Sequence, residues 1–260
     1  MKIAYAGFDL FYPMLESLHN NGCEIVKIFS CEVDNVTEFN RDVTNFAKSH
    51  AIPITYDKIT ISDLEELKES GVEALFCAAY YYRMPILHDF KMINVHPSLL
   101  PKGRGSWPMP VAILEKYEKS GVTFHKMEED FDTGEIIMQK SFELSVNENL
   151  LSFMDKIYAL LPDMVKTLLS DFDYYYDSAE KQGEGEYLQA IDERDYIITP
   201  NTDFEKADRI LRAFFGFYVL YSDGEKEYSL LSGTAAKGEN KDKQFKIKGG
   251  YIEYTNCVIN

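Results

Sequence analysis

Residues 92–139 have the sequence MINVHPSLLPKGRGSWPMPVAILEKYEKSGVTFHKMEEDFDTGEIIMQ, and the rest of the chain is organised around this stretch. The apolar run at its start is typical of a buried strand, and Asn94 and His96 alternate within it, so their side chains share one face. A loop rich in Pro and Gly, a predicted helix (about 106–118), a predicted strand (121–127) and an acidic turn with Asp132 follow. Because open sheets bind ligands at their strand ends, this pattern predicts a site.

The chemistry that these three residues allow is the acylation of an amine or its reverse. Neutral His96 can take a proton from an attacking amine, while Asp132 would orient the imidazole, stabilise its charged form and raise its pKa. The amide of Asn94 can donate a hydrogen bond to the oxyanion that develops at an attacked carbonyl. Taken alone, the same residues also fit a strand end whose histidine caps a loop carbonyl.

The N-terminal part of the chain alternates predicted strands with predicted helices. The strands are expected at 2–7, 23–30, 52–56 and 73–80, and the helices at 11–18, 41–50 and 62–70, the last beginning with a Ser62–Glu65 capping box. This alternation predicts an α/β fold with a Rossmann-like, mostly parallel sheet and helices on both faces. Gly7 follows the first strand without a G-x-G-x-x-G motif, which disfavours a nicotinamide or flavin dinucleotide.

The C-terminal part has a different pattern. A long amphipathic helix, bent at Pro162, is predicted over 148–172, and a helix running into a strand over 203–221. Short strand-like runs follow at 227–233, 244–250 and 251–259. Because 174–187 is polar and contains Gly, we place the domain boundary there, with a catalytic domain at 1–175 and a small β-rich domain at 176–260.

Composition restricts the class of protein. The 260 residues carry a formal net charge of −16, which disfavours a broad contact with nucleic-acid phosphates. No run approaches eighteen consecutive apolar residues, and the N-terminus has no signal-peptide pattern, so a cytoplasmic protein is expected. The four cysteines are widely spaced and the histidines show no ligand spacing, which predicts free thiols and no metal site.

Four motifs resemble the formyltransferase family, whose members move a formyl group from 10-formyltetrahydrofolate to an amine. They are Asn-x-His-Pro-Ser-Leu-Leu-Pro at 94–101, Arg-Gly at 104–105, Gly-Val-Thr at 121–123 and Asp-Thr-Gly at 132–134. The resemblance covers roughly residues 1–175. It implies that Asn94, His96 and Asp132 are catalytic and that 10-formyltetrahydrofolate is the formyl donor.

The resemblance also implies a folate pocket between two walls and a loop. The matching positions are Met84, Pro85 and Ile86 in one wall, Glu128, Glu129, Asp130, Phe131 and Asp132 in the other, and Ser98, Leu99, Leu100 and Pro101 in the loop. Such pockets are mainly apolar with a few oriented polar groups, and these segments fit that description. His125, on the predicted strand 121–127, is interpreted as a half-buried structural histidine.

The acceptor amine divides the family into enzymes for methionyl-tRNA, for nucleotide-linked amino sugars and for glycinamide ribonucleotide. Segment 31–42 (CEVDNVTEFNRD) has four acidic residues and one Arg, where the tRNA enzymes carry a basic loop. The sequence resembles the amino-sugar nucleotide enzymes most, and Lys102 and Arg104 would then contact a diphosphate or else form a solvated loop. The tRNA enzyme, a formyltetrahydrofolate hydrolase and a non-catalytic folate-binding module remain alternatives, and a homodimer is left open.

Overall fold

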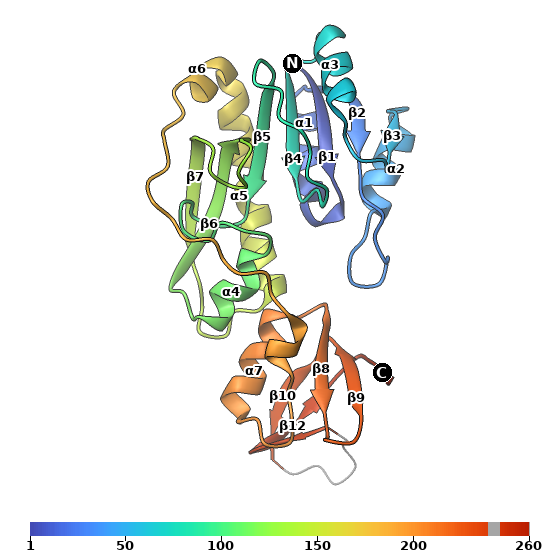
Figure 1. Ribbon diagram of the computed structural model, residues 1–260, viewed down its shortest axis with the longest axis vertical. Coiled ribbons are helices and arrows are strands. Elements are labelled where there is room, and N and C mark those ends of the chain that lie inside the picture. The colour runs from blue at the N-terminus through green and yellow to red at the C-terminus, as the bar shows by residue number, and fades with distance from the viewer. Residues whose placement is uncertain (239–244, 260) are drawn as a thin grey trace. The chain divides into compact units, whose positions relative to one another are not determined.

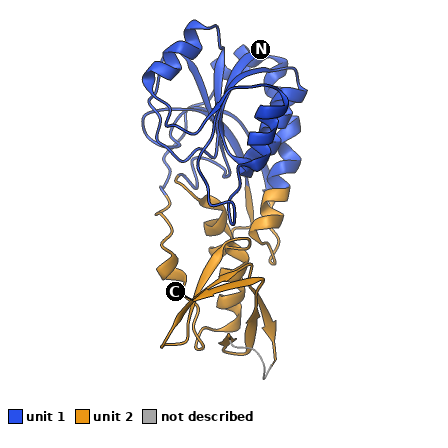
Figure 2. Cartoon of the chain, turned by 90° about the vertical axis from the view of Figure 1, so that its right-hand side faces the viewer, with its two compact units in different colours: residues 1–104, 121–142, 156–187 blue, residues 105–120, 143–155, 188–260 orange. Residues whose placement is uncertain are grey.

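The chain folds into two compact units. The computed structural model describes residues 1–238 and 245–259. Unit 1 comprises residues 1–104, 121–142 and 156–187, and unit 2 comprises residues 105–120, 143–155 and 188–260 (Figure 2). The expected domain boundary between residues 175 and 176 stays a prediction.

Unit 1 is built on a seven-stranded sheet (Figure 1). The strand order is β3-β2-β1-β4-β5-β6-β7, and β5 and β6 are antiparallel whereas the strands from β3 to β5 are parallel. The strands are β1 (Lys2–Gly7), β2 (Glu24–Phe29), β3 (Ile54–Thr55), β4 (Ala74–Ala78), β5 (Lys91–His96), β6 (Lys119–Lys126) and β7 (Ile136–Glu143). The prediction of a mostly parallel α/β sheet is confirmed.

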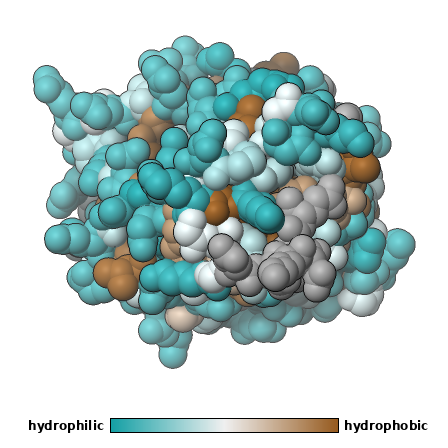
Figure 3. Space-filling model, turned by 90° about the horizontal axis from the view of Figure 1, so that it is seen from below, coloured by the Kyte–Doolittle hydropathy of each residue, from teal (hydrophilic) through white to brown (hydrophobic). Residues whose placement is uncertain are grey.

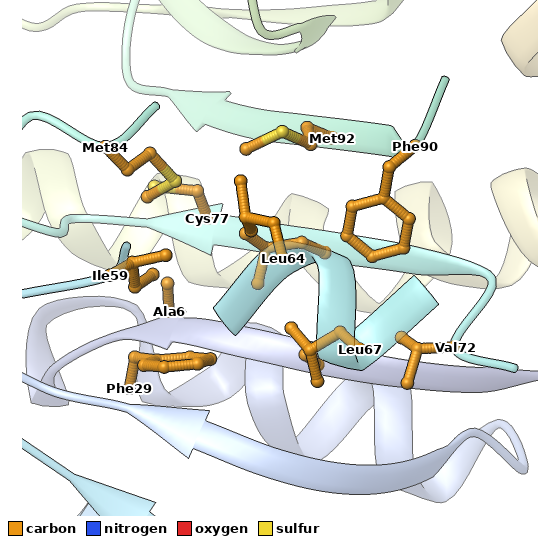
Figure 4. Packing of buried hydrophobic residues seen from close by; sticks show 12 residues of the cluster. Ala6, Phe29, Ile59, Leu64, Leu67, Val72, Cys77, Met84, Phe90 and Met92 are labelled. Atoms are coloured by element: carbon orange, nitrogen blue, oxygen red, sulfur yellow. The ribbon is translucent and has the colours of Figure 1, made fainter. Parts of the chain in front are cut away.

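Successive residues of a strand point to opposite sides of the sheet, so buried strands present apolar side chains on both faces. Helices cover both of these faces. On one face, Leu64 and Leu67 of α3 (Ile61–Glu69) pack in a buried cluster with Ala6, Cys77 and other strand residues (Figure 4). On the other face, the Tyr5 hydroxyl donates a hydrogen bond to the Phe11 carbonyl, in the 3-10 helix η1 (Asp9–Phe11). That helix leads into α1 (Tyr12–Asn20), and α2 (Arg41–Ser49) follows β2.

Several helix ends differ from the expected ones, and three helices illustrate this. The capping box of α3 is formed by Thr60 and Asp63 instead of Ser62 and Glu65, so the helix begins one residue earlier than expected. Helix α4 (Pro108–Leu114) is shorter than 106–118 and is followed by Lys116 with φ of +55°. The expected helix at 148–172 corresponds to α5 (Leu150–Ser170), which continues through Pro162, and a helix that was not expected, α6 (Phe172–Asp177), follows with Asp171 as its cap.

The described residues of unit 2 form two three-stranded sheets. Their orders are β10-β12-β11 and β13-β9-β8, with antiparallel pairing. The elements that follow the 3-10 helix η2 (Glu193–Tyr196) are α7 (Phe204–Ala213), β8 (Tyr218–Ser222), β9 (Glu227–Leu231), β10 (Thr234–Lys237), β11 (Lys246–Ile247), β12 (Gly250–Glu253) and β13 (Asn256–Ile259). The β-rich C-terminal part is confirmed, although residue 244 of the expected strand-like run 244–250 lies outside the described residues.

The surface and the thiols agree with the composition. Hydrophilic side chains predominate among the coloured atoms of the face in Figure 3, and hydrophobic ones are scattered there. Cys23, Cys31 and Cys77 are buried free thiols, and Cys257 is a partly exposed one. Within residues 1–238 and 245–259, no helix is long and apolar enough to cross a membrane.

Candidate active site

Strand β5 brings two polar side chains to the carboxyl edge of the sheet. Asn94 and His96 share the face of Met92, which packs in the core cluster further back along the strand. His96 is the last residue of β5 and is 5% exposed. A largely buried strand therefore carries an amide and an imidazole near its end, as the alternation of residues 92–96 predicts.

Asp132 completes the cluster from a turn 36 residues after His96. Its Oδ1 lies 3.3 Å from His96 Nδ1 and accepts a hydrogen bond from Asn94 Nδ2 at 3.4 Å. The Asp132 side chain is 9% exposed, and its φ of +57° is in the left-handed region, which few side chains other than Asn and Asp occupy. The structure thus brings the three expected residues together, with a carboxylate in contact with both of the others.

The imidazole of His96 has both nitrogens engaged. Because a carbonyl can only accept, Nε2 carries the hydrogen and donates it to the Gly103 carbonyl at 2.7 Å. In the neutral ring, Nδ1 is therefore the basic nitrogen, and it faces Asp132. The strand-end histidine does cap a loop carbonyl, and the same ring still presents a basic nitrogen to the carboxylate.

Asp132 acts to raise the pKa of His96, as expected, but the net shift of that pKa is downward. Burial lowers the pKa of His96 below the 6.5 of a free histidine, since charge is costly away from water. Asp132 and the Gly103 carbonyl act in the opposite direction without reversing the shift, and His125 lowers the pKa further. Neutral His96, the form that can accept a proton, is favoured at pH 7.

His125 is a site residue that the sequence interpretation missed. It is 2% exposed, lies opposite Asn94 in the β5–β6 pairing, and its Nε2 is 3.5 Å from Asp132 Oδ1. Its Nδ1 donates to the Lys126 carbonyl at 2.7 Å, so in the neutral ring Nε2 can only accept, and it receives Asn94 Nδ2–H at 3.1 Å. His125 therefore orients the Asn94 amide as a donor.

The glycine of the Asp-Thr-Gly motif explains how the turn reaches β5. A Cβ placed on Gly134 would lie 1.9 Å from the Lys126 carbonyl oxygen and 2.7 Å from its carbon. Real Cβ atoms essentially never come under 3.0 Å, so only glycine fits where the turn packs on the end of β6. Gly134 allows the backbone of the turn to lie close to the backbone of Lys126, and this close contact places Asp132 beside His96.

The Gly-Val-Thr motif holds the loop that follows His96. Thr123 is fully buried, and its hydroxyl donates to the Ser98 carbonyl at 2.6 Å and accepts from the Leu100 N–H at 3.3 Å. A Cβ on Gly121 would lie 2.4 Å from a methyl carbon of Leu99. These contacts fix the Ser98–Pro101 loop against β6.

The two expected walls of a folate pocket lie next to each other. Arg83 donates from Nη2 to the Glu129 carbonyl at 2.9 Å, and its guanidinium lies over the Phe131 ring at 5.6 Å. Met84 belongs to the core cluster, with Ile86 packed against it. The positions Glu128, Glu129, Asp130 and Phe131 are exposed, whereas Leu100 is buried. An apolar floor beside an exposed polar turn would suit a flat heterocycle with hydrogen-bonding edges.

The two basic residues expected to bind the acceptor occupy different environments. Lys102 is exposed, and its carbonyl accepts from the Ser98 hydroxyl at 2.9 Å. Arg104 is 8% exposed and donates to Gln182 and to the Gly183 carbonyl. Its contact with an acceptor stays a prediction. Within residues 1–238 and 245–259, no group of three or more His, Cys, Asp and Glu side chains is arranged to hold a metal ion.

Comparison with known proteins finds similarity over the segment that contains these residues. A family model described as formyl transferase matches residues 38–165, which include Asn94, His96 and Asp132. A curated methionyl-tRNA formyltransferase from Ehrlichia ruminantium (strain Gardel) is 28% identical over 170 residues, which are 64% of this chain and 55% of that protein. The chain thus spans about half the length of this relative.

Solved structures share the fold. HypX from Aquifex aeolicus, in complex with tetrahydrofolic acid, superimposes with a TM-score of 0.75 at 14% identity, over 99% of this chain and 44% of that chain. The N-formyltransferase from Helicobacter canadensis, in complex with folinic acid and dTDP-3-aminofucose, superimposes with a TM-score of 0.69 at 22% identity, over 97% of this chain and 98% of that chain.

Proposed function

We propose that the chain transfers a formyl group from 10-formyltetrahydrofolate to a primary amine, because residues 38–165 match a family model described as formyl transferase. The observation that carries the proposal is that Asp132 Oδ1 lies within 3.4 Å of both Asn94 Nδ2 and His96 Nδ1 at the end of β5. An amide donor, a neutral imidazole and a carboxylate supply what acyl transfer to an amine requires.

The roles of the three residues follow from their contacts. One Asn94 amide hydrogen stays on His125 at 3.1 Å, and the other, which reaches Asp132 at 3.4 Å, would turn to the formyl oxygen as that oxygen gains charge. The amine nitrogen bonds to the formyl carbon while the bond from that carbon to the folate nitrogen breaks. His96 Nδ1 would accept the amine proton beside Asp132 and return it to the leaving nitrogen, a contribution of about 10²–10⁴ in rate.

The acceptor that we favour is a nucleotide-linked amino sugar. The acidic segment 31–42 follows β2, which is parallel to β5, so it starts from the same edge of the sheet as the site. Within it, Asp34 accepts backbone hydrogen bonds from Val36 and Glu38, which lower its pKa to about 2 although partial burial opposes the shift. A fixed negative charge there disfavours the phosphates of a tRNA, while exposed Lys102 could contact a diphosphate.

Methionyl-tRNA is the second candidate for the acceptor, because curated relatives are methionyl-tRNA formyltransferases. A screen with 10-formyltetrahydrofolate decides between the two, with tetrahydrofolate formation followed by absorbance. We expect a higher kcat/KM on members of a panel of amino-sugar nucleotides than on methionyl-tRNA.

Binding of the folate is tested separately. Titration calorimetry should detect binding of 5-formyltetrahydrofolate, a stable isomer of the donor.

The controls of this screen separate the remaining alternatives. Formate release without an acceptor, at the rate seen with one, would indicate a hydrolase. Folate binding with neither transfer nor hydrolysis would indicate a binding module. A clear preference for methionyl-tRNA would overturn the ranking of acceptors, and no binding at millimolar 5-formyltetrahydrofolate would overturn the proposed function.

Two substitutions of His125 test whether it orients Asn94. In His125→Asn the shorter amide can still donate to the Lys126 carbonyl but cannot reach Asn94, whereas in His125→Gln an amide oxygen can take the place of Nε2. We expect His125→Asn to lower kcat by about tenfold or more, and His125→Gln to retain most of it. Equal losses in the two variants, measured at matched thermal stability, would show that the Asn94 contact is unimportant.

A further inference from the structure

A segment far along the chain lies against the Asp132 turn. Residues 180–187, which we call the strap, follow α6 in Figure 1. The strap begins with paired backbone hydrogen bonds between Ile136 and Glu180, at 2.8 and 2.9 Å. It ends at Tyr187, whose hydroxyl donates to the Phe131 carbonyl at 2.7 Å. Both ends of the strap are thus bonded to residues that flank Asp132.

Gln182 in the strap donates hydrogen bonds to the turn on both sides of Thr133. Its Nε2 donates to the Asp132 carbonyl at 2.9 Å and to the Gly134 carbonyl at 2.6 Å. These two bonds use both amide hydrogens. One of these carbonyls belongs to Asp132 itself, whose left-handed backbone conformation persists only where surrounding contacts impose it.

Arg104 fixes which way the Gln182 amide points. Its Nε and Nη2 donate to Gln182 Oε1 at 3.2 and 2.8 Å, and Nη2 also donates to the Gly183 carbonyl at 3.1 Å. A reversed amide would direct its hydrogens at the guanidinium and its oxygen at two carbonyls, so only the observed orientation is favourable. Arg104 is buried and donates hydrogen bonds to Gln182 and Gly183, so its position can be explained without a phosphate of the acceptor.

The strap also packs on the loop that follows His96. A Cβ on Gly185 would lie 2.3 Å from the Pro101 carbonyl oxygen, so the backbones touch there. By contrast, a Cβ on Gly183 would meet nothing within 4 Å. The strap therefore contacts both the turn that carries Asp132 and the loop after His96.

We propose that Gln182 is a positioning residue that holds Asp132 against His96, with Arg104 as the partner that orients it. The proposal rests on the proposed function only for its effect on rate. The geometry itself can be tested without substrate, because Asp132 acts on the ionisation of His96.

The test is ¹⁵N NMR of the full chain with labelled histidines, which follows the titration and tautomer of His96, in the wild type and in three variants. Gln182→Met removes all four hydrogen bonds, Gly185→Ala displaces the strap, and Gly183→Ala is the matched control. Since Asp132 raises the pKa of His96 and His125 lowers it, we expect a lower pKa in the first two variants and no change in Gly183→Ala.

Activity is the second measurement. Gln182→Met and Gln182→Glu should each lower kcat by about tenfold or more, with little change in KM. Gln182→Glu keeps an acceptor for Arg104 but cannot donate to the turn, so wild-type activity in that variant would overturn the proposal. An unchanged His96 titration in both folded Gln182→Met and folded Gly185→Ala would overturn it too. If His96 shifts as expected but the wild type transfers no formyl group, the positioning role stands and the proposed function fails.

Discussion

Replacing Asp132 by Asn, His96 by Asn or Asn94 by Ala should each lower kcat by about two orders of magnitude or more. The estimate follows from the worth of general-base assistance, about 10²–10⁴, and of one oxyanion donor, about 10²–10³. An amide at position 132 cannot stabilise the imidazolium as a carboxylate does, so Asp132→Asn would leave His96 a weaker base. Steady-state kinetics with a saturating amine acceptor measures the effect.

Coupling between Asp132 and His96 distinguishes a catalytic unit from independent contacts. The double variant Asp132→Asn, His96→Asn should lose much less than the product of the two single losses, because groups acting as one unit fail together. Binding of 5-formyltetrahydrofolate, which should change little, is the control for folding.

The pH dependence of kcat is a separate test of His96. Because burial lowers the pKa of His96, its basic form persists below pH 6.5, and the fall of kcat in acid that its protonation causes should lie below that value. Near-full kcat in His96→Asn would refute the assignment.

Substitution of Gly134 by Ala should destabilise the chain and remove most of its activity. The new methyl group would lie 1.9 Å from the Lys126 carbonyl oxygen, which is backbone and cannot rotate away. The turn that carries Asp132 must therefore shift. We expect a loss of about 2–4 kcal/mol in the free energy of unfolding, and about a hundredfold in kcat for the fraction that stays folded.

Gly183→Ala is the matched comparison for this variant, since the same added methyl group meets open space there. Chemical denaturation gives the stability change and single-turnover kinetics gives the activity change. If both glycine variants behaved like the wild type, the close approach of the turn to β6 would not control Asp132. If Gly134→Ala were unstable but fully active per folded molecule, the turn would matter for stability alone.

Local sequence determined most of the strands, although β7 and β10 were not expected, as well as the face that carries Asn94 and His96 and the outline of the fold. A continuous apolar run such as 73–80 is typical of a strand whose side chains are buried on both faces of a sheet. The two-residue period of a strand puts the side chains of positions 94 and 96 on one side. Helix ends were less well determined because several polar residues near each end could serve as the cap. The choice of Thr60 and Asp63 over Ser62 and Glu65 illustrates this.

The tertiary structure alone decided which distant residues complete the site and how they ionise. His125 faces Asn94 because of the register of an antiparallel pair, and a single strand pattern carries no register with its neighbour. The lowered pKa of His96 reflects the balance between burial and Asp132, which depends on three-dimensional packing. Gln182 lies 50 residues from Asp132, and only the course of the strap brings its amide to that turn.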